Sequence, residues 1–108
     1  MDTKIELQEH AREFTRWMIL RMLYAVRPGG VCEIILLRVL GSLDFNCELD
    51  DVRREVDYLR SVGLAEAGEG RLTGRSARLT ELGVAVVEYS AHAPAGIDRP
   101  RRRRSSKR

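Results

Sequence analysis

Apolar residues recur with helical spacing in three successive segments of this chain, and the pattern stops at Gly63. The segments cover about residues 2–26, 32–40 and 48–62, and turn-forming residues such as those at 28–30 separate them. Apolar positions three and four residues apart lie on one face of a helix. The sequence therefore predicts three helices in the first 62 residues.

Two short segments with strand character follow, at 64–67 and 76–80, with glycines between them. They predict a two-stranded ribbon with a glycine-rich, basic tip. Thr80 is a good N-cap for a last helix that runs through Val86 to Tyr89. Helix, helix, helix, ribbon, helix is the order of a winged helix, in which the second and third helices form the helix–turn–helix and the ribbon is the wing. We expect a mainly α fold with a small β-hairpin.

The chain has 108 residues, enough for one modest core. We expect a winged-helix domain over residues 1–91 and an extended, arginine-rich tail over 92–108. The apolar run at 17–26 is broken by Arg21 and is too short to span a bilayer, and the acidic N-terminal turns are unlike a signal peptide. These features predict a cytoplasmic protein, in a bacterial host cell if its source is a phage.

The charge is divided unevenly along the chain. Residues 1–98 carry 12 Lys and Arg against 16 Asp and Glu, a net charge of −4. Residues 99–108 carry seven basic residues and no acid, so the basic balance of the whole chain comes from its last ten residues. A run of this kind can neutralise phosphates without reading sequence.

The stretch YLRSVGLAEAGEGRLTGRSARLTELG, residues 58–83, resembles the recognition-helix end and wing of MarR- and ArsR-type winged-helix regulators. The matching residues are Tyr58, Leu59, Gly63, Leu64, Leu79, Thr80 and Gly83. QEHAREFTRWMILRML, LTELGVAVVE and PAGIDRP are similar to segments of the small winged-helix proteins of transposable phages of the Mu type. A closing "PG(I/V)xRP"-like motif is matched, with one inserted alanine, by Pro94, Gly96, Ile97, Arg99 and Pro100. The first resemblance implies a DNA-binding regulator, and the second implies the fold.

The third helix is rich in acids for a helix that would enter a DNA groove. Its stretch CELDDVRREVDYL holds five acids and two arginines. Leu49, Val52, Val56 and Leu59 form its inward stripe. Each arginine has aspartates three or four residues away, and such local ion pairs, worth about 0.3–0.5 kcal/mol each, compete with DNA contacts. Acids in the first turn also stabilise the helix through its dipole.

Three groups of residues are candidates for contacting duplex DNA. The third helix offers Arg53, Arg54 and Tyr58 on its outward side. The wing offers Arg71, Thr73, Arg75 and Arg78, which suit phosphates or a minor groove. The tail offers Arg99, Arg101, Arg102, Arg103, Arg104, Lys107 and Arg108. Arginine runs also bind RNA and acidic proteins, so the tail's partner stays open.

The first helix carries two apolar stripes. One contains Leu7, Ala11, Phe14, Met18 and Met22. The other contains Trp17, Leu20 and Tyr24, which makes these three residues candidates for a homodimer interface. The alternative is that both stripes lie within the core of a single chain.

We therefore expect a non-enzymatic DNA-binding protein, a phage or bacterial transcriptional regulator whose wing and tail contact phosphates. The alternative is a protein-interaction or phage-structural module whose acidic helix at 48–62 docks a basic partner. Cys32 and Cys47 have no metal-ligand spacing, and no nucleophile–base pair or phosphate-binding glycine loop is visible. The sequence thus predicts no metal, no cofactor and no membrane partner.

Overall fold

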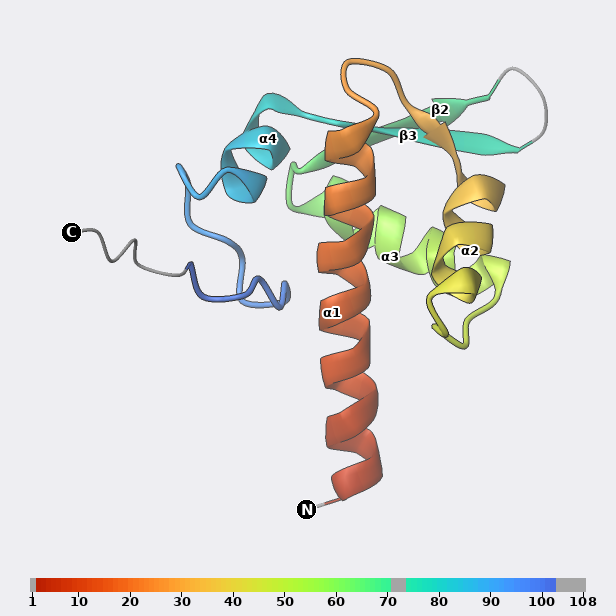
Figure 1. Cartoon of the computed structure of the whole chain (residues 1–108), viewed down its shortest axis with the longest axis vertical. Coiled ribbons are helices and arrows are strands. Elements are labelled where there is room, and N and C mark those ends of the chain that lie inside the picture. The colour runs from red at the N-terminus through yellow and green to blue at the C-terminus, as the bar shows by residue number, and fades with distance from the viewer. Residues whose placement is uncertain (1, 71–73, 103–108) are drawn as a thin grey trace.

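The computed structural model describes residues 2–70 and 74–102. Within these residues the chain is a mixed α/β arrangement of four helices and a small three-stranded antiparallel sheet (Figure 1). The elements are α1 (Thr3–Ala25), β1 (Val31–Cys32), α2 (Glu33–Ser42), α3 (Leu49–Ser61), β2 (Ala65–Glu69), β3 (Arg75–Leu79) and α4 (Glu81–Val87). Each predicted helix and both predicted strands begin and end within two residues of their expected bounds, and α4 ends at Val87, two residues before Tyr89.

Side chains at the helix N-termini explain where the helices begin. The Asp2 carboxylate accepts the Lys4 N–H at α1, and the Thr80 hydroxyl accepts the Gly83 N–H at α4. At α3 the Glu48 N–H donates to the Asp51 carboxylate at 2.8 Å, as part of a capping box. Asp51 therefore has a structural role in the first turn of α3.

The sheet contains one strand that the sequence did not predict. Its order is β1-β3-β2, and β3 pairs with both neighbours through Ala77, which lies opposite Val31 and Ala67. We expected a two-stranded ribbon, but the two residues of β1 add a third strand directly before α2. A two-residue strand is too short to show an alternation of apolar and polar residues in the sequence. Only its pairing with a distant segment identifies it.

The core lies between α1, α3, α2 and the sheet. Val52, Val56 and Leu59 of the predicted inward stripe of α3 are fully buried. Other fully buried members of the core are Ile19, Leu20, Leu23, Leu36, Leu40, Leu64 and Val86. Their removal from water is the main source of stability for a chain of this size.

The two apolar stripes of α1 have roles different from those expected. Trp17 is 4% exposed and Leu20 is 0% exposed, and both pack inside the core of this chain. Tyr24 is half-buried and its hydroxyl donates to Glu88 at 2.6 Å. Trp17 and Leu20 are therefore covered within a single chain, and a homodimer interface through them stays a prediction. Leu7, from the other stripe, is 64% exposed.

The chain does not leave the body at the predicted boundary after residue 91. Residues 94–100, which we call the C-terminal strap, pack against α1 and α4. Ile97 is buried, and the Asp98 N–H donates to the Glu13 carbonyl. The Tyr89 hydroxyl donates to the Pro100 carbonyl at 2.6 Å. The folded unit thus reaches Pro100, because the strap has an apolar anchor and partners for its backbone.

None of the helices in the described part of the chain is long and apolar enough to cross a membrane.

Candidate nucleic-acid interface

The solvent-facing side of α3 carries charged residues, and its inward side carries an unexpected one. Asp50, Arg53, Arg54, Asp57 and Arg60 are exposed. Glu55 shares the inward side with Val52, Val56 and Leu59, and it is 2% exposed. A buried carboxylate is costly unless cations and hydrogen bonds compensate it. The partners of Glu55 therefore determine what the neighbouring arginines can do.

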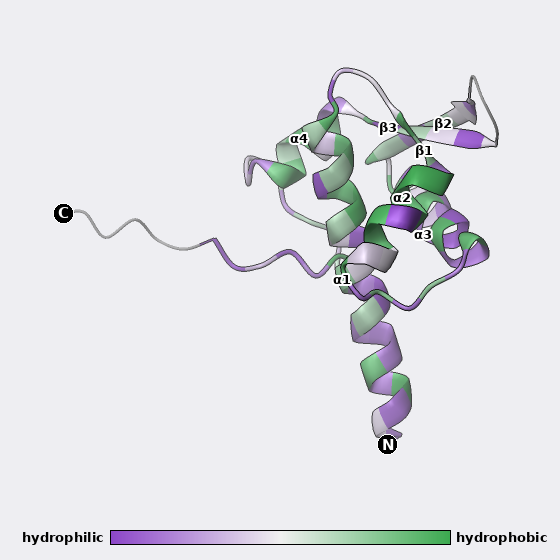
Figure 2. Ribbon diagram, turned by 45° about the vertical axis from the view of Figure 1, so that its right-hand side comes forward, coloured by the Kyte–Doolittle hydropathy of each residue, from purple (hydrophilic) through white to green (hydrophobic). Residues whose placement is uncertain are grey.

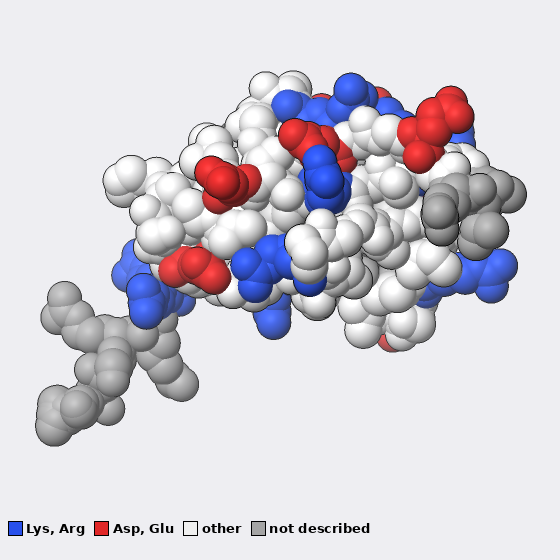
Figure 3. Space-filling view, turned by 90° about the horizontal axis from the view of Figure 1, so that it is seen from above, with Lys and Arg blue, Asp and Glu red and all other residues white. Residues whose placement is uncertain are grey.

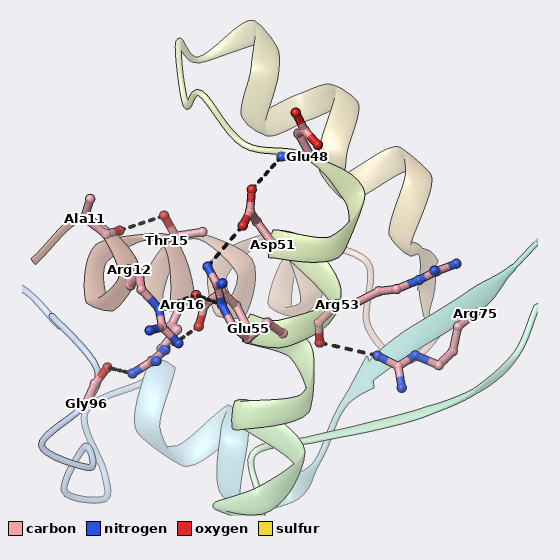
Figure 4. A network of polar contacts seen from close by, with 11 residues as sticks. Ala11, Arg12, Thr15, Arg16, Glu48, Asp51, Arg53, Glu55, Arg75 and Gly96 are labelled. Atoms are coloured by element: carbon pink, nitrogen blue, oxygen red, sulfur yellow. Dashed lines mark hydrogen bonds and ion pairs between the residues drawn. The ribbon is translucent and has the colours of Figure 1, made fainter. Parts of the chain in front are cut away.

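Arginines from two helices converge on Glu55, as Figure 4 shows. Arg16 donates from Nε to Oε1 at 2.7 Å, and Arg12 donates from Nε to Oε2 at 2.9 Å. Arg54 contacts Oε2 at 3.4 Å and also pairs with Asp51 at 3.1 Å. Arg54, a predicted DNA contact, is thus engaged by two carboxylates of its own helix.

Arg16 also connects α3 to the C-terminal strap. Its Nη1 donates to the Gly96 carbonyl at 2.9 Å, and its guanidinium lies over the Tyr58 ring, 3.8 Å from the centroid. Tyr58 is half-buried beneath this contact. The prediction that Tyr58 faces DNA is therefore not supported, because its ring is covered by Arg16 and its hydroxyl lies against Gly96.

A second buried carboxylate holds the β2–β3 hairpin against the helices. Glu33, at the start of α2, is 1% exposed. Arg75 of β3 donates to its Oε2 from Nε at 2.9 Å and from Nη2 at 2.7 Å. Arg75 also pairs with Asp57 of α3 at 2.9 Å. Hydrogen bonding to Glu33, the largest effect, raises the pKa of Arg75, so its charge is retained.

Arg53 is bound more loosely than Arg75. Its Nε lies 3.4 Å from Glu33 Oε1, and its side chain remains about half exposed. Arg75, a predicted DNA contact, uses its donors within the protein, as the dashed line to the Arg53 carbonyl in Figure 4 partly shows. Arg53 is accordingly the more available of the two for a phosphate.

The other predicted DNA contacts have mixed positions. Arg78, on β3, is exposed and pairs with Glu66 of β2. Arg99 donates from Nη1 to the Val86 and Ala91 carbonyls and lies 4.3 Å over the Tyr89 ring, so it anchors the strap. Arg101 and Arg102 are exposed. Arg71, Thr73, Arg103, Arg104, Lys107 and Arg108 lie outside the described residues.

The surface does not present one continuous basic field. Figure 3 shows acidic side chains beside basic ones over the end of the molecule seen from above, with basic side chains also gathered where the tail begins. In the described part of the chain, Arg21 of α1 and Arg38 of α2 are exposed and have neither a hydrogen bond nor an ion pair from their side chains. Sequence reasoning did not select these two arginines, because they lie inside apolar helical runs.

Two further titratable groups have shifted pKa values without forming a reactive cluster. Partial burial, and to a lesser degree the charge of Asp51, raises the pKa of the Cys47 thiol. The hydrogen bond to Glu88 raises the pKa of Tyr24. Among the residues that the structure describes, no three His, Cys, Asp or Glu side chains are grouped so that they could hold a metal ion.

A groove of about 560 Å³ runs between the N-terminal half of α1 and the start of α3. Arg12, Arg54 and Glu55 line it together with Ile5 and Cys47. Glu55 already binds Arg12 and Arg54. The polar groups that line the groove therefore serve the contact between α1 and α3.

Comparisons with protein-family models, with curated proteins and with solved structures found no match to this chain.

Proposed function

We propose that this protein is a non-enzymatic winged-helix DNA-binding protein, acting as a phage or bacterial transcriptional regulator. In this proposal α2 and α3 are the helix–turn–helix, and the β2–β3 hairpin is the wing. The element order supports it, because two helices joined by a short connection are followed directly by the hairpin and then by α4.

The observation that carries the proposal is the position of Arg75. This residue of β3 binds Glu33 at the start of α2 and Asp57 of α3. It thereby ties the hairpin to both helices. A protein that contacts the backbone and a groove of one duplex needs its helix and its wing at a fixed separation, because DNA phosphates are regularly spaced.

The proposed division of roles follows from the ion pairs. The arginines of α3 are engaged by Glu33, Asp51, Asp57 and Glu55, which disfavours base reading by this helix. The basic tip of the wing and the tail beyond Pro100 would then provide most phosphate contacts, and Arg78 would have to exchange its pair with Glu66 for a phosphate. Arg53 would add one contact from α3, since its bond to Glu33 is long.

The test is a salt titration of binding to duplex DNA, comparing the full chain with a chain ending at Pro100. The cut belongs there because Arg99 and Pro100 are part of the folded body. Six basic residues follow Pro100. If all six engage phosphates, the slope of log K against log salt should be steeper for the full chain by about 5, at about 0.9 per contact.

Failure of both chains to bind duplex DNA at low salt would refute the proposal. Binding by the full chain alone would limit DNA contact to the tail and favour the second candidate, a protein-interaction module on the same scaffold. Asp50, exposed on α3 and without a hydrogen bond or ion pair from its side chain in the described part of the chain, is the feature of the body that suits a basic partner. Circular dichroism of both chains serves as the folding control.

A further inference from the structure

Large apolar side chains are exposed in two rows on the outer sides of α1 and α2. Leu7 and Phe14 are seven residues apart on α1, and Ile35, Val39 and Leu43 follow one another at intervals of four on and just after α2. Residues at these spacings lie on one side of a helix. All five are between 37% and 64% exposed. Isolated exposed apolar residues are ordinary, but a group of this size is typical of an interaction site.

One ring contact joins the two rows. The Phe14 ring stacks on Phe45, with centroids 5.9 Å apart and an angle of 17° between planes. Phe45 comes two residues after Leu43, so the stack joins the end of the α2 row to α1. Figure 1 shows α1 in front of α3, with α2 beside it, and Figure 2 colours much of α2 as hydrophobic. We call the surface formed by Leu7, Phe14, Arg21, Ile35, Arg38, Val39 and Leu43 the α1–α2 face.

The charge of this face is positive. Arg21 is seven residues after Phe14 in the same row, and Arg38 lies beside Ile35 and Val39. Neither arginine side chain has a hydrogen bond or an ion pair in the described part of the chain. Neither row contains a carboxylate, although Glu6 and Glu13 directly precede Leu7 and Phe14, and Asp44 directly follows Leu43. In contrast, the arginines of α3 and Arg78 of the hairpin are paired with carboxylates.

Three kinds of occupant can be compared on this basis. A second copy using the same face would bring the unpaired arginines of two chains together without a carboxylate between them. Duplex DNA would satisfy the arginines but would leave five apolar side chains without apolar partners. An anionic bilayer would accept the arginines and the apolar side chains, yet the face has no Trp or Tyr of the kind that interfacial helices use. An acidic amphipathic segment of another protein satisfies the charge and the apolar rows together.

We propose that the α1–α2 face docks an acidic amphipathic segment of a partner protein. The seven residues of this face are on α1 and on or just after α2, and none of them is on α3 or on the β2–β3 hairpin. DNA and a protein partner could then bind at the same time. This inference does not depend on DNA binding, because its test contains no DNA.

The test uses the full chain and a fluorescent synthetic helical peptide with a leucine row flanked by glutamates. The control peptide has lysine in place of each glutamate. We expect saturable, salt-sensitive binding of the acidic peptide and none of the basic one. A chain carrying both Arg21→Glu and Arg38→Glu should bind the acidic peptide at least about fivefold more weakly, since two attractions become repulsions. Arg60→Glu, a matched change on α3, should leave peptide binding unchanged.

Three results would overturn the proposal. The first is equal binding of both peptides, or binding of neither. The second is binding to vesicles of phosphatidylcholine and phosphatidylserine that the double variant loses, because a lipid surface would then be the occupant. The third is a dimer in sedimentation that the double variant dissociates, because the face would then join two copies. Trp17 emission and circular dichroism check that each variant is folded.

Discussion

Arg16 of α1 and Glu55 of α3 face each other across the contact between their helices, with Nε and Oε1 2.7 Å apart. The carboxylate is almost completely buried, and the same arginine binds the strap through the Gly96 carbonyl. One ion pair therefore connects the first helix, the third helix and the C-terminal strap. Its position explains why the proposed recognition helix holds a glutamate on its inward side.

Removing the carboxylate of this pair should strongly destabilise the fold. Glu55→Leu leaves Arg16 buried without a charged partner, and we expect a loss of about 3–5 kcal/mol in the free energy of unfolding. Arg54→Ala removes an exposed pair with Asp51 and a long contact of 3.4 Å to Glu55, which keeps Arg12 and Arg16, and it should cost about 1 kcal/mol or less. Urea unfolding followed by circular dichroism measures both values. Similar losses for the two variants would contradict the assigned role of Glu55.

A methyl group at Gly96 should dislodge the strap. A Cβ at this position would overlap the Tyr58 hydroxyl and lie 2.8 Å from Arg16 Nη1. We expect Gly96→Ala to cost about 1–3 kcal/mol, the usual range for overpacking. Gly68→Ala is the control, because a Cβ there meets nothing within 4 Å. Hydrogen exchange at the Asp98 amide, which donates to the Glu13 carbonyl, should accelerate in the first variant only.

Variants of Arg75 and Arg53 should show which arginine stabilises the fold and which one contacts DNA. Arg75→Ala leaves Glu33 with a single long contact to Arg53, so we expect a loss of about 1–3 kcal/mol in stability. Arg53→Ala should change stability by less than about 1 kcal/mol and should weaken DNA binding, with a salt slope smaller by about 1. Anisotropy titrations at several salt concentrations provide the comparison. Loss of DNA affinity without loss of stability for Arg75→Ala would reverse the two assignments.

Cys47 should react slowly with iodoacetamide near neutral pH. Its raised pKa means that less thiolate is present at a given pH, so the alkylation rate should rise at a higher pH than for an exposed cysteine. Asp51→Asn removes the smaller of the two causes and should move the profile toward lower pH. The measurement uses a Cys32→Ser background and mass spectrometry. An unchanged profile would mean that Asp51 does not influence the thiol.

Trp17, the single tryptophan, reports whether its burial depends on a partner. Because it packs within one chain against Tyr89, in an edge-to-face contact at 6.3 Å, its emission should be blue-shifted and independent of protein concentration. A red shift on dilution would show that a second copy covers it and would restore Trp17 as an interface residue. Tyr89→Leu, which keeps an apolar neighbour, is a control for local packing.

Local pattern was sufficient to predict most of the elements. Helical spacing, glycine breaks and the cap at Thr80 act over a few residues, so α1, α2, α3, β2 and β3 were found close to their actual bounds. The inward residues Val52, Val56 and Leu59 followed from the same spacing. Glu55 shares that spacing, and a carboxylate on an apolar stripe is a signal that a buried cation partner exists. This signal was present in the sequence and was missed.

The distant partners of the arginines were decided only by the tertiary structure. The sequence alone determined the helical periods, the excess of acid in the body and the basic run at the end of the chain. Tertiary packing determined that Glu33 holds Arg75, that Glu55 holds Arg16, and that Arg99 secures the strap. It also determined which stripe of α1 faces the core. In two of these three pairings the residues are about 40 or more positions apart in the sequence. No local spacing encodes which distant carboxylate or carbonyl a given guanidinium will reach.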